Sequence, residues 1–183
     1  MKIAVIFPGI GYHADKPLLY FSRMIAKAHG YDCVNVNYGN FPKNIKGSKE
    51  KMKEAFFSAL DQAEFILRTV EFRKYEDILF LSKSVGTAVA AAYAEKHGLE
   101  TRNIYYTPIG ESFDFIRQEG IVFHGTDDGW VETEVIQKAC AQKNFPLYLT
   151  EHGNHSLETG DACTDLSNLK KIMEITQKYI EEK

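Results

Sequence analysis

The sequence has no apolar run long enough to cross a membrane, which takes about 20 residues. Its start, Met1 to Gly9, is a short apolar run stopped by Pro8 and Gly9, without the longer hydrophobic region and cleavage site of a signal peptide. We therefore expect a cytoplasmic protein with no membrane partner.

Cysteine is also scarce. The sequence has an odd number of cysteines and no CxxC pair: Cys33, Cys140 and Cys163. This argues against a disulfide framework and against a metal site built from thiolates, and it agrees with a reducing compartment.

A surplus of basic residues is missing as well. The 22 Lys and Arg residues are scattered along the chain and are outnumbered by 25 Asp and Glu, giving a net charge of −3. Nucleic acid is therefore not an expected partner, since it is bound through clustered positive charge. With no repeat, low-complexity tract or linker in 183 residues that are 44% hydrophobic, we expect one domain over residues 1–183. No feature fixes an oligomeric state.

Short β-rich runs alternate with stretches of helical periodicity. The expected strands are Lys2–Phe7, Asp32–Tyr38, Asp77–Ser82, Asn103–Tyr106, Gly120–His124 and Phe145–Thr150. The expected helices are Lys16–His29, Ser48–Phe72, Val85–His97, Glu132–Gln142 and Thr164–Glu181, with a short irregular piece at Glu111–Gln118. Gly30 and Gly98 are expected helix stops, and Thr164 is an expected N-cap. The alternation predicts a three-layer α/β/α fold, doubly wound around a parallel sheet.

The composition of the runs also predicts the strand order. The first, third and fifth runs are almost continuously apolar, as in strands covered on both faces, whereas Asp32–Tyr38 alternates with polar residues and is typical of an edge. If the chain winds outward from a central first strand, the order is 2-1-3-4-5-6. The functional site is then expected at the carboxyl ends of the strands, near the switch point.

A strand, a sharp turn and a helix follow one another around Ser84, in Leu81-Ser82-Lys83-Ser84-Val85-Gly86. A nucleophile on such a turn needs small residues two positions before and two after it, and Ser82 and Gly86 meet that need. The alternative is that Ser82 and Ser84 only cap the helix. Lys83 is interpreted as a solvated cation or one at a pocket rim.

Two later loops contain the partners that a serine nucleophile needs, a base and an acid that orients it. Asp127 and Asp128 follow the fifth strand, and His152 and His155 follow the sixth. The order Ser, Asp, His is that of α/β hydrolases.

On these motifs the whole chain resembles the α/β-hydrolase family, in particular its small members without a lid, such as the dienelactone-hydrolase-like and compact esterase groups. The resemblance implies that Asp128, rather than Asp127, is the acid, in the pattern Gly125, Asp128, Val131, and that His155 is the base. It also implies that the turn Pro8-Gly9-Ile10-Gly11 supplies the backbone N–H of Ile10 as an oxyanion donor together with that of Val85. The departures are Pro8 in place of a frequent histidine and Ser82 in place of glycine.

This resemblance implies a serine hydrolase that cleaves a small carboxylic ester or thioester through an acyl-enzyme, with no cofactor and no metal. A short amide or a C–C bond is an alternative target. Aromatic residues in or near the loops at the catalytic end could line a substrate pocket. They are Tyr12, Phe41, Tyr106, Phe113 and Trp130, although for each one singly ordinary core packing is the favoured interpretation. The loops 40–47 and 107–114 are candidates for specificity.

Other functions remain open. Gly9-Ile10-Gly11-Tyr12-His13-Ala14 fits the glycine fingerprint of dinucleotide-binding proteins, but no acid ends the second strand where a ribose would need one. His152 and His155 have a spacing found in metal sites, with Asp127 or Asp128 as a carboxylate ligand, but a third histidine is not placed. An inactive interaction protein on a hydrolase fold is the remaining alternative.

Overall fold

A computed structural model describes residues 1–41, 45 and 47–182. The strands are β1 (Lys2–Phe7), β2 (Tyr31–Asn35), β3 (Asp77–Lys83), β4 (Arg102–Tyr106), β5 (Gly120–Gly125) and β6 (Leu147–Thr150). The helices are α1 (Pro17–Ala28), α2 (Lys49–Leu67), α3 (Val85–His97), α4 (Thr133–Lys143) and α5 (Ala162–Glu181), with 3-10 turns η1 (Phe72–Lys74) and η2 (Gly110–Asp114). Within the described residues, no helix is long and apolar enough to cross a membrane.

The six strands form one parallel sheet in the order β2-β1-β3-β4-β5-β6, which confirms the predicted fold class and strand order. The register pairs Phe7 with Ser82 and Lys83 with Tyr106, so that the ends of β1, β3 and β4 lie level. The loops that follow these strands consequently meet at one edge of the sheet.

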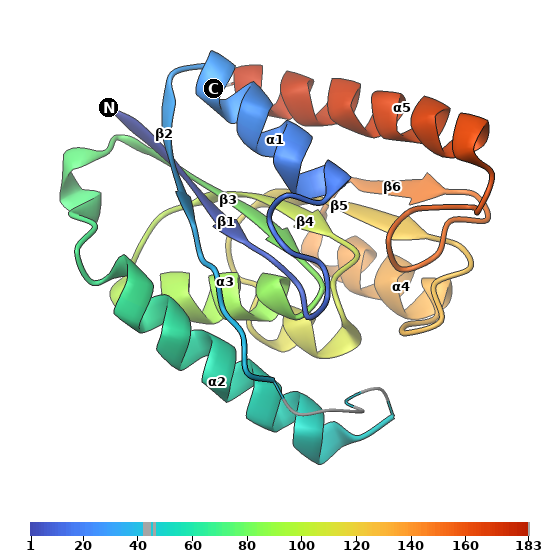
Figure 1. The fold of residues 1–183 in the computed structure, drawn as a ribbon, viewed down its shortest axis with the longest axis horizontal. Coiled ribbons are helices and arrows are strands. Elements are labelled where there is room, and N and C mark those ends of the chain that lie inside the picture. Colours follow the sequence, from blue (N-terminus) through green and yellow to red (C-terminus); the bar gives the residue numbers. More distant parts are fainter. Residues whose placement is uncertain (42–44, 46, 183) are drawn as a thin grey trace.

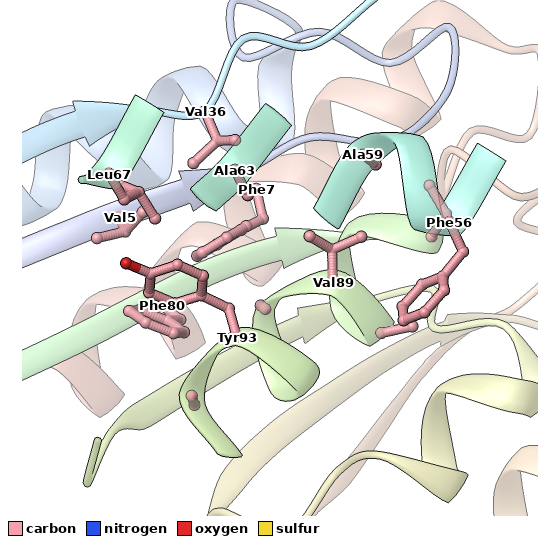
Figure 2. Packing of buried hydrophobic residues seen from close by; sticks show 14 of the residues in the cluster. Val5, Phe7, Val36, Phe56, Ala59, Ala63, Leu67, Phe80, Val89 and Tyr93 are labelled. Atoms are coloured by element: carbon pink, nitrogen blue, oxygen red, sulfur yellow. The ribbon is translucent and has the colours of Figure 1, made fainter. Parts of the chain in front are cut away.

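Helices cover both faces of the sheet. Helices α1 and α5 lie side by side on one face, and α2, α3 and α4 lie on the other (Figure 1). Figure 2 shows the core beneath α2 and α3, where Phe7 and Phe80 of the sheet meet Val89 and Tyr93 of α3. The centroids of the Phe7 and Phe80 rings are 4.9 Å apart. This packing fixes α3, and with it the turn that precedes α3, against the middle of the sheet.

Several predicted boundaries need correction. Strand β2 ends at Asn35 instead of Tyr38, and the second helix ends at Leu67 instead of Phe72. The N-cap of the last helix is Asp161, whose carboxylate accepts a hydrogen bond from the N–H of Thr164 at 2.8 Å. Gly30 and Gly98 have the positive φ of helix stops, as predicted.

Candidate active site

Ser84 lies on the turn between β3 and α3 with a strained backbone. Its φ of 55° and ψ of −128° are unusual for a residue with a side chain, and such a conformation costs about 1–3 kcal/mol. Three hydrogen bonds hold it there. The Ser84 N–H donates to the carbonyl of Tyr106 at 3.0 Å, and the Ser84 carbonyl accepts from the N–H and the hydroxyl of Thr87 at 2.9 and 2.6 Å. The turn is therefore imposed by the structure around it.

The turn after β1 packs directly against the Ser84 turn, and two glycines make this possible. A Cβ on Gly86 would lie 2.3 Å from the carbonyl oxygen of Pro8 and 2.4 Å from that of Phe7. A Cβ on Gly9 would lie 3.0 Å from Cβ of Ser84. Close backbone approach thus explains the small residue two positions after Ser84.

The side chains of Ser84, His155 and Asp128 form a continuous hydrogen-bonded chain. Ser84 Oγ lies 2.8 Å from His155 Nε2, and His155 Nδ1 lies 2.7 Å from Asp128 Oδ2. Both distances are those of direct hydrogen bonds. Residues far apart in the sequence therefore meet in the arrangement that activates a serine hydroxyl.

Asp128 is held as a buried carboxylate. Its side chain has no exposed surface, and Oδ1 accepts a hydrogen bond from the N–H of Trp130 at 2.8 Å. Burial alone would raise its pKa, but hydrogen bonds and attraction from His155, together with the Trp130 N–H, lower it below its ordinary value. The neighbouring Asp127 is 60% exposed and points to His152, at 3.5 Å. The structure thus brings Asp128, and not Asp127, to His155.

The loops that carry Asp128 and His155 are tied to each other and to the sheet. The Asp127 N–H donates to the carbonyl of Gly153 at 3.0 Å, and a Cβ on Gly125 would lie only 2.1 Å from that carbonyl oxygen. The hydroxyl of Thr107, just beyond β4, donates to the carbonyl of His155 at 3.0 Å. The position of the imidazole is therefore fixed by backbone contacts on two sides.

The backbone N–H groups of the glycine turn after β1 and of the Ser84 turn are not all used in hydrogen bonds between described residues. Gly9 and Tyr12 bond to each other through their backbones, at 3.1 and 3.3 Å. Within the described part of the chain, neither the Ile10 nor the Val85 N–H donates a hydrogen bond, and both residues line the cavity next to Ser84. Helix α1 begins only at Pro17, whereas in a dinucleotide fingerprint the glycines open the helix.

A cavity of about 210 Å³ lies over Ser84 and His155. Of the predicted pocket residues, Tyr12 and Trp130 line it. The ring of Trp130 also stacks on the imidazole of His155, with centroids 5.4 Å apart and planes inclined by 30°. Trp130 thus contacts two members of the chain, one through its ring and one through its backbone.

The other predicted pocket residues lie elsewhere. Tyr106 is fully buried, and its hydroxyl bonds to those of Ser22 at 2.8 Å and Thr176 at 2.6 Å, under α1 and α5. Phe113 belongs to the core below η2, and Phe41 packs edge-on against Tyr38. The predicted specificity loop 40–47 falls partly outside the described residues. Tyr106, Phe113 and Phe41 do not line this cavity, and their predicted place in its wall is wrong.

Two buried residues near the site differ from, or add to, the sequence analysis. Lys83 is 1% exposed, so its interpretation as a solvated cation is wrong, and it lines the cavity. His124 is fully buried, with Nδ1 3.7 Å from Asp128 Oδ2 and Nε2 3.3 Å from the Thr133 hydroxyl. Burial lowers the pKa of His124, which favours the neutral imidazole beside that carboxylate.

The two histidines with metal-site spacing face different carboxylates, His155 facing Asp128 and His152 facing Asp127. In residues 1–41, 45 and 47–182, no group of three or more His, Cys, Asp or Glu side chains could hold a metal ion.

Comparison with known proteins identifies the fold. Neither a protein-family model nor a curated protein sequence matches the chain. An α/β serine hydrolase homologue from Coxiella burnetii superimposes with a TM-score of 0.69 at 15% identity, covering 97% of this chain and 84% of that one. The chain has the α/β-hydrolase fold.

Two further structures with this fold are similar. Est1E from Butyrivibrio proteoclasticus, solved with ferulic acid bound, matches at a TM-score of 0.66 and 14% identity, over 100% of this chain and 90% of that one. A protein from Xanthomonas campestris described as an α/β serine hydrolase without lid matches at 0.64 and 12% identity, over 97% and 80%. At this identity the likeness establishes an α/β-hydrolase fold, while the chemistry has to be argued from the site.

Proposed function

We propose that the protein is a serine hydrolase that cleaves a small carboxylic ester or thioester. The observation that carries the proposal is the unbroken hydrogen-bonded chain from Ser84 through His155 to Asp128, at 2.8 and 2.7 Å. The similarity to structures described as serine hydrolases supports it.

In the proposed mechanism Ser84 Oγ attacks the substrate carbonyl while His155 Nε2 takes the hydroxyl proton. Asp128 fixes the tautomer of His155 through Nδ1 and stabilises the imidazolium that forms. His155 then returns the proton to the leaving group, which departs and leaves an acyl-serine. Water, activated by the same imidazole, hydrolyses the acyl-serine and restores the enzyme.

The N–H groups of Ile10 and Val85 are the proposed oxyanion donors. Both residues line the cavity, and neither N–H is used inside the described part of the protein. The loss of one such donor typically costs about 3–4 kcal/mol of transition-state stabilisation. Because the Ile10 turn is pressed against the Ser84 turn, the two donors are positioned before substrate arrives.

The dimensions of the cavity point to a small substrate. Its volume of about 210 Å³ is below the range of roughly 300–1,000 Å³ typical of drug-sized ligands. Tyr12 and Trp130 give it apolar walls close to the nucleophile. A short acyl group with a small leaving group fits this space, and no cofactor is needed for the proposed steps.

The test is the hydrolysis of p-nitrophenyl acetate by the wild type and by the variants Ser84→Ala, His155→Ala and Asp127→Asn. We expect the first two variants to lose about 10³-fold or more in kcat/KM. Asp127→Asn is the matched control, because it alters the adjacent exposed carboxylate, and it should retain near wild-type activity. Equal rates for the wild type and Ser84→Ala would refute the proposal.

A further inference from the structure

Two lysines line the cavity above Ser84. They are Lys16 and Lys83, and no aspartate or glutamate of the described residues lines it. The nearby carboxylate of Asp128 lies behind His155, fully buried and already engaged by His155 and Trp130. The lining of the cavity therefore includes two lysines and no carboxylate of the described chain.

Lys83 is the more informative of the two. It is 1% exposed and forms no salt bridge with any described residue. The contact of its ammonium group is the ring of Tyr12, whose centroid lies 5.0 Å from Nζ. An ammonium group buried without a counter-ion is costly, and proteins seldom keep one without a function.

Burial lowers the pKa of Lys83 to about 7, against the attraction of the carboxylates of Asp128 and Glu158. Neither carboxylate forms a salt bridge with the Lys83 amine. An apolar side chain of the same length would fill this space without that cost. The amine, rather than its stem, therefore needs an explanation.

Lys16 extends the same feature towards solvent. Its Nζ lies 5.8 Å from the centroid of the Tyr12 ring, the same ring that Lys83 contacts. Lys16 is exposed, whereas Lys83 is buried beside the nucleophile. The ring of Tyr12 thus lies near two lysine amines, and all three residues line the cavity that Ser84 and His155 also line.

We propose that the substrate carries an anionic group, a carboxylate, which pairs with Lys83 when the ester occupies the cavity, while Lys16 attracts it from the rim. This inference rests on the proposed hydrolase function and narrows its substrate class to small carboxylate-bearing esters or thioesters. An anion beside Lys83 favours the charged amine and replaces the missing counter-ion. Lys83 is accordingly a specificity-determining residue.

The test compares kcat/KM for two matched pairs of substrates, after subtraction of spontaneous hydrolysis. In the first pair, phenyl succinate monoester is compared with the phenyl ester of succinamic acid, so the charge is on the acyl part. In the second, 3-acetoxybenzoate is compared with phenyl acetate, so the charge is on the leaving group. The variants are Lys83→Met, Lys16→Met and Lys138→Met, the last altering an exposed lysine of α4 outside the cavity.

We expect the wild type to prefer the anionic member of one pair by about tenfold or more, the factor typical of a charged hydrogen bond. The pair that shows the preference tells whether the anion lies on the acyl or the leaving side. Lys83→Met should lose the preference, because its kcat/KM falls by about tenfold more for the anionic ester than for the neutral one. Lys16→Met should weaken the preference in low salt, and Lys138→Met should leave it unchanged.

Reactivity of Ser84 towards a neutral fluorophosphonate distinguishes a failure of the anionic-substrate inference from a failure of the hydrolase proposal. If Ser84 of the wild type reacts but the enzyme shows no preference in either pair, or if the preference survives in Lys83→Met, the anionic-substrate inference is wrong and the hydrolase proposal stands. If Ser84 does not react, the hydrolase proposal fails and this inference fails with it. Lys83→Gln serves as a second uncharged variant if Lys83→Met does not fold.

Discussion

Replacing Gly86 by alanine tests how tightly the Ser84 turn is pressed against the end of β1. The added Cβ would lie 2.3 Å from the carbonyl oxygen of Pro8 and 2.4 Å from that of Phe7, where ordinary contacts begin at 3.4 Å. The backbone would therefore have to separate by roughly 1 Å. The clash is with main-chain atoms, so a side-chain rotation cannot relieve it.

Two effects of Gly86→Ala oppose each other in the free energy of unfolding. Alanine favours a helix by about 1 kcal/mol over glycine, whereas overpacking of this kind costs about 1–3 kcal/mol or more. We expect a net destabilisation of roughly 1–2 kcal/mol, measured by urea denaturation. Activity should fall further, by about 10²-fold in kcat/KM, because a shift of 1 Å between Ile10 and Ser84 separates the proposed donor from the nucleophile.

Gly39→Ala is the matched control, since no atom lies within 4 Å of its added Cβ and its φ is not positive. It should change neither stability nor kcat/KM appreciably. A Gly86→Ala protein as stable and as active as the wild type would refute the close approach and the positioning argument built on it.

Three further predictions concern single side chains. Asp128→Asn should fold but lose about 10³–10⁴-fold in kcat for a p-nitrophenyl ester, because it no longer fixes the tautomer of the base; a loss below tenfold would contradict this. Lys83→Met should raise the free energy of unfolding at pH 6 by roughly 2–5 kcal/mol, since the buried charge is fully destabilising below the folded pKa of Lys83, about 7. This gain in stability should vanish as the pH rises towards the ordinary lysine pKa of 10.5. Equal stability of the variant and the wild type at pH 6 would count against it. Tyr106→Phe should lower the free energy of unfolding by about 1–2 kcal/mol, because it removes the hydrogen bonds to Ser22 and Thr176. KM for small esters should stay unchanged, and a raised KM would support the predicted place of Tyr106 in the pocket.

The fold was largely predictable because strand and helix periodicities alternate without interruption. The errors lie at the ends of two elements. The polar alternation around β2 continues to Tyr38, but β1 ends at Phe7, and the Val36 N–H makes the last bond to it, at Ile6. Apolar residues also continue beyond Leu67, yet α2 stops there, and the Val70 N–H turns back to the Leu67 carbonyl. Local pattern does not reveal how far a neighbour extends.

At the site, sequence spacing identified residues that follow strand ends but not the direction of side chains within the strands. Leu79 and Leu81 lie in the core beneath α1 and α5, and strand alternation places Lys83 on that same face, which excludes the solvated position assigned to it. Ile104 and Tyr106 likewise lie in that core, where the Tyr106 hydroxyl bonds to Ser22 and Thr176, and Tyr106 does not line the cavity. These were signals available in the sequence.

The most direct test of the central claim is intact-mass analysis after labelling with a fluorophosphonate at neutral pH, followed by peptide mapping. We predict one adduct per chain, located on Ser84, absent in Ser84→Ala and formed far more slowly in His155→Ala. A folded wild-type protein that forms no adduct, or forms it on another residue, would contradict the assignment of Ser84, His155 and Asp128 as a catalytic unit.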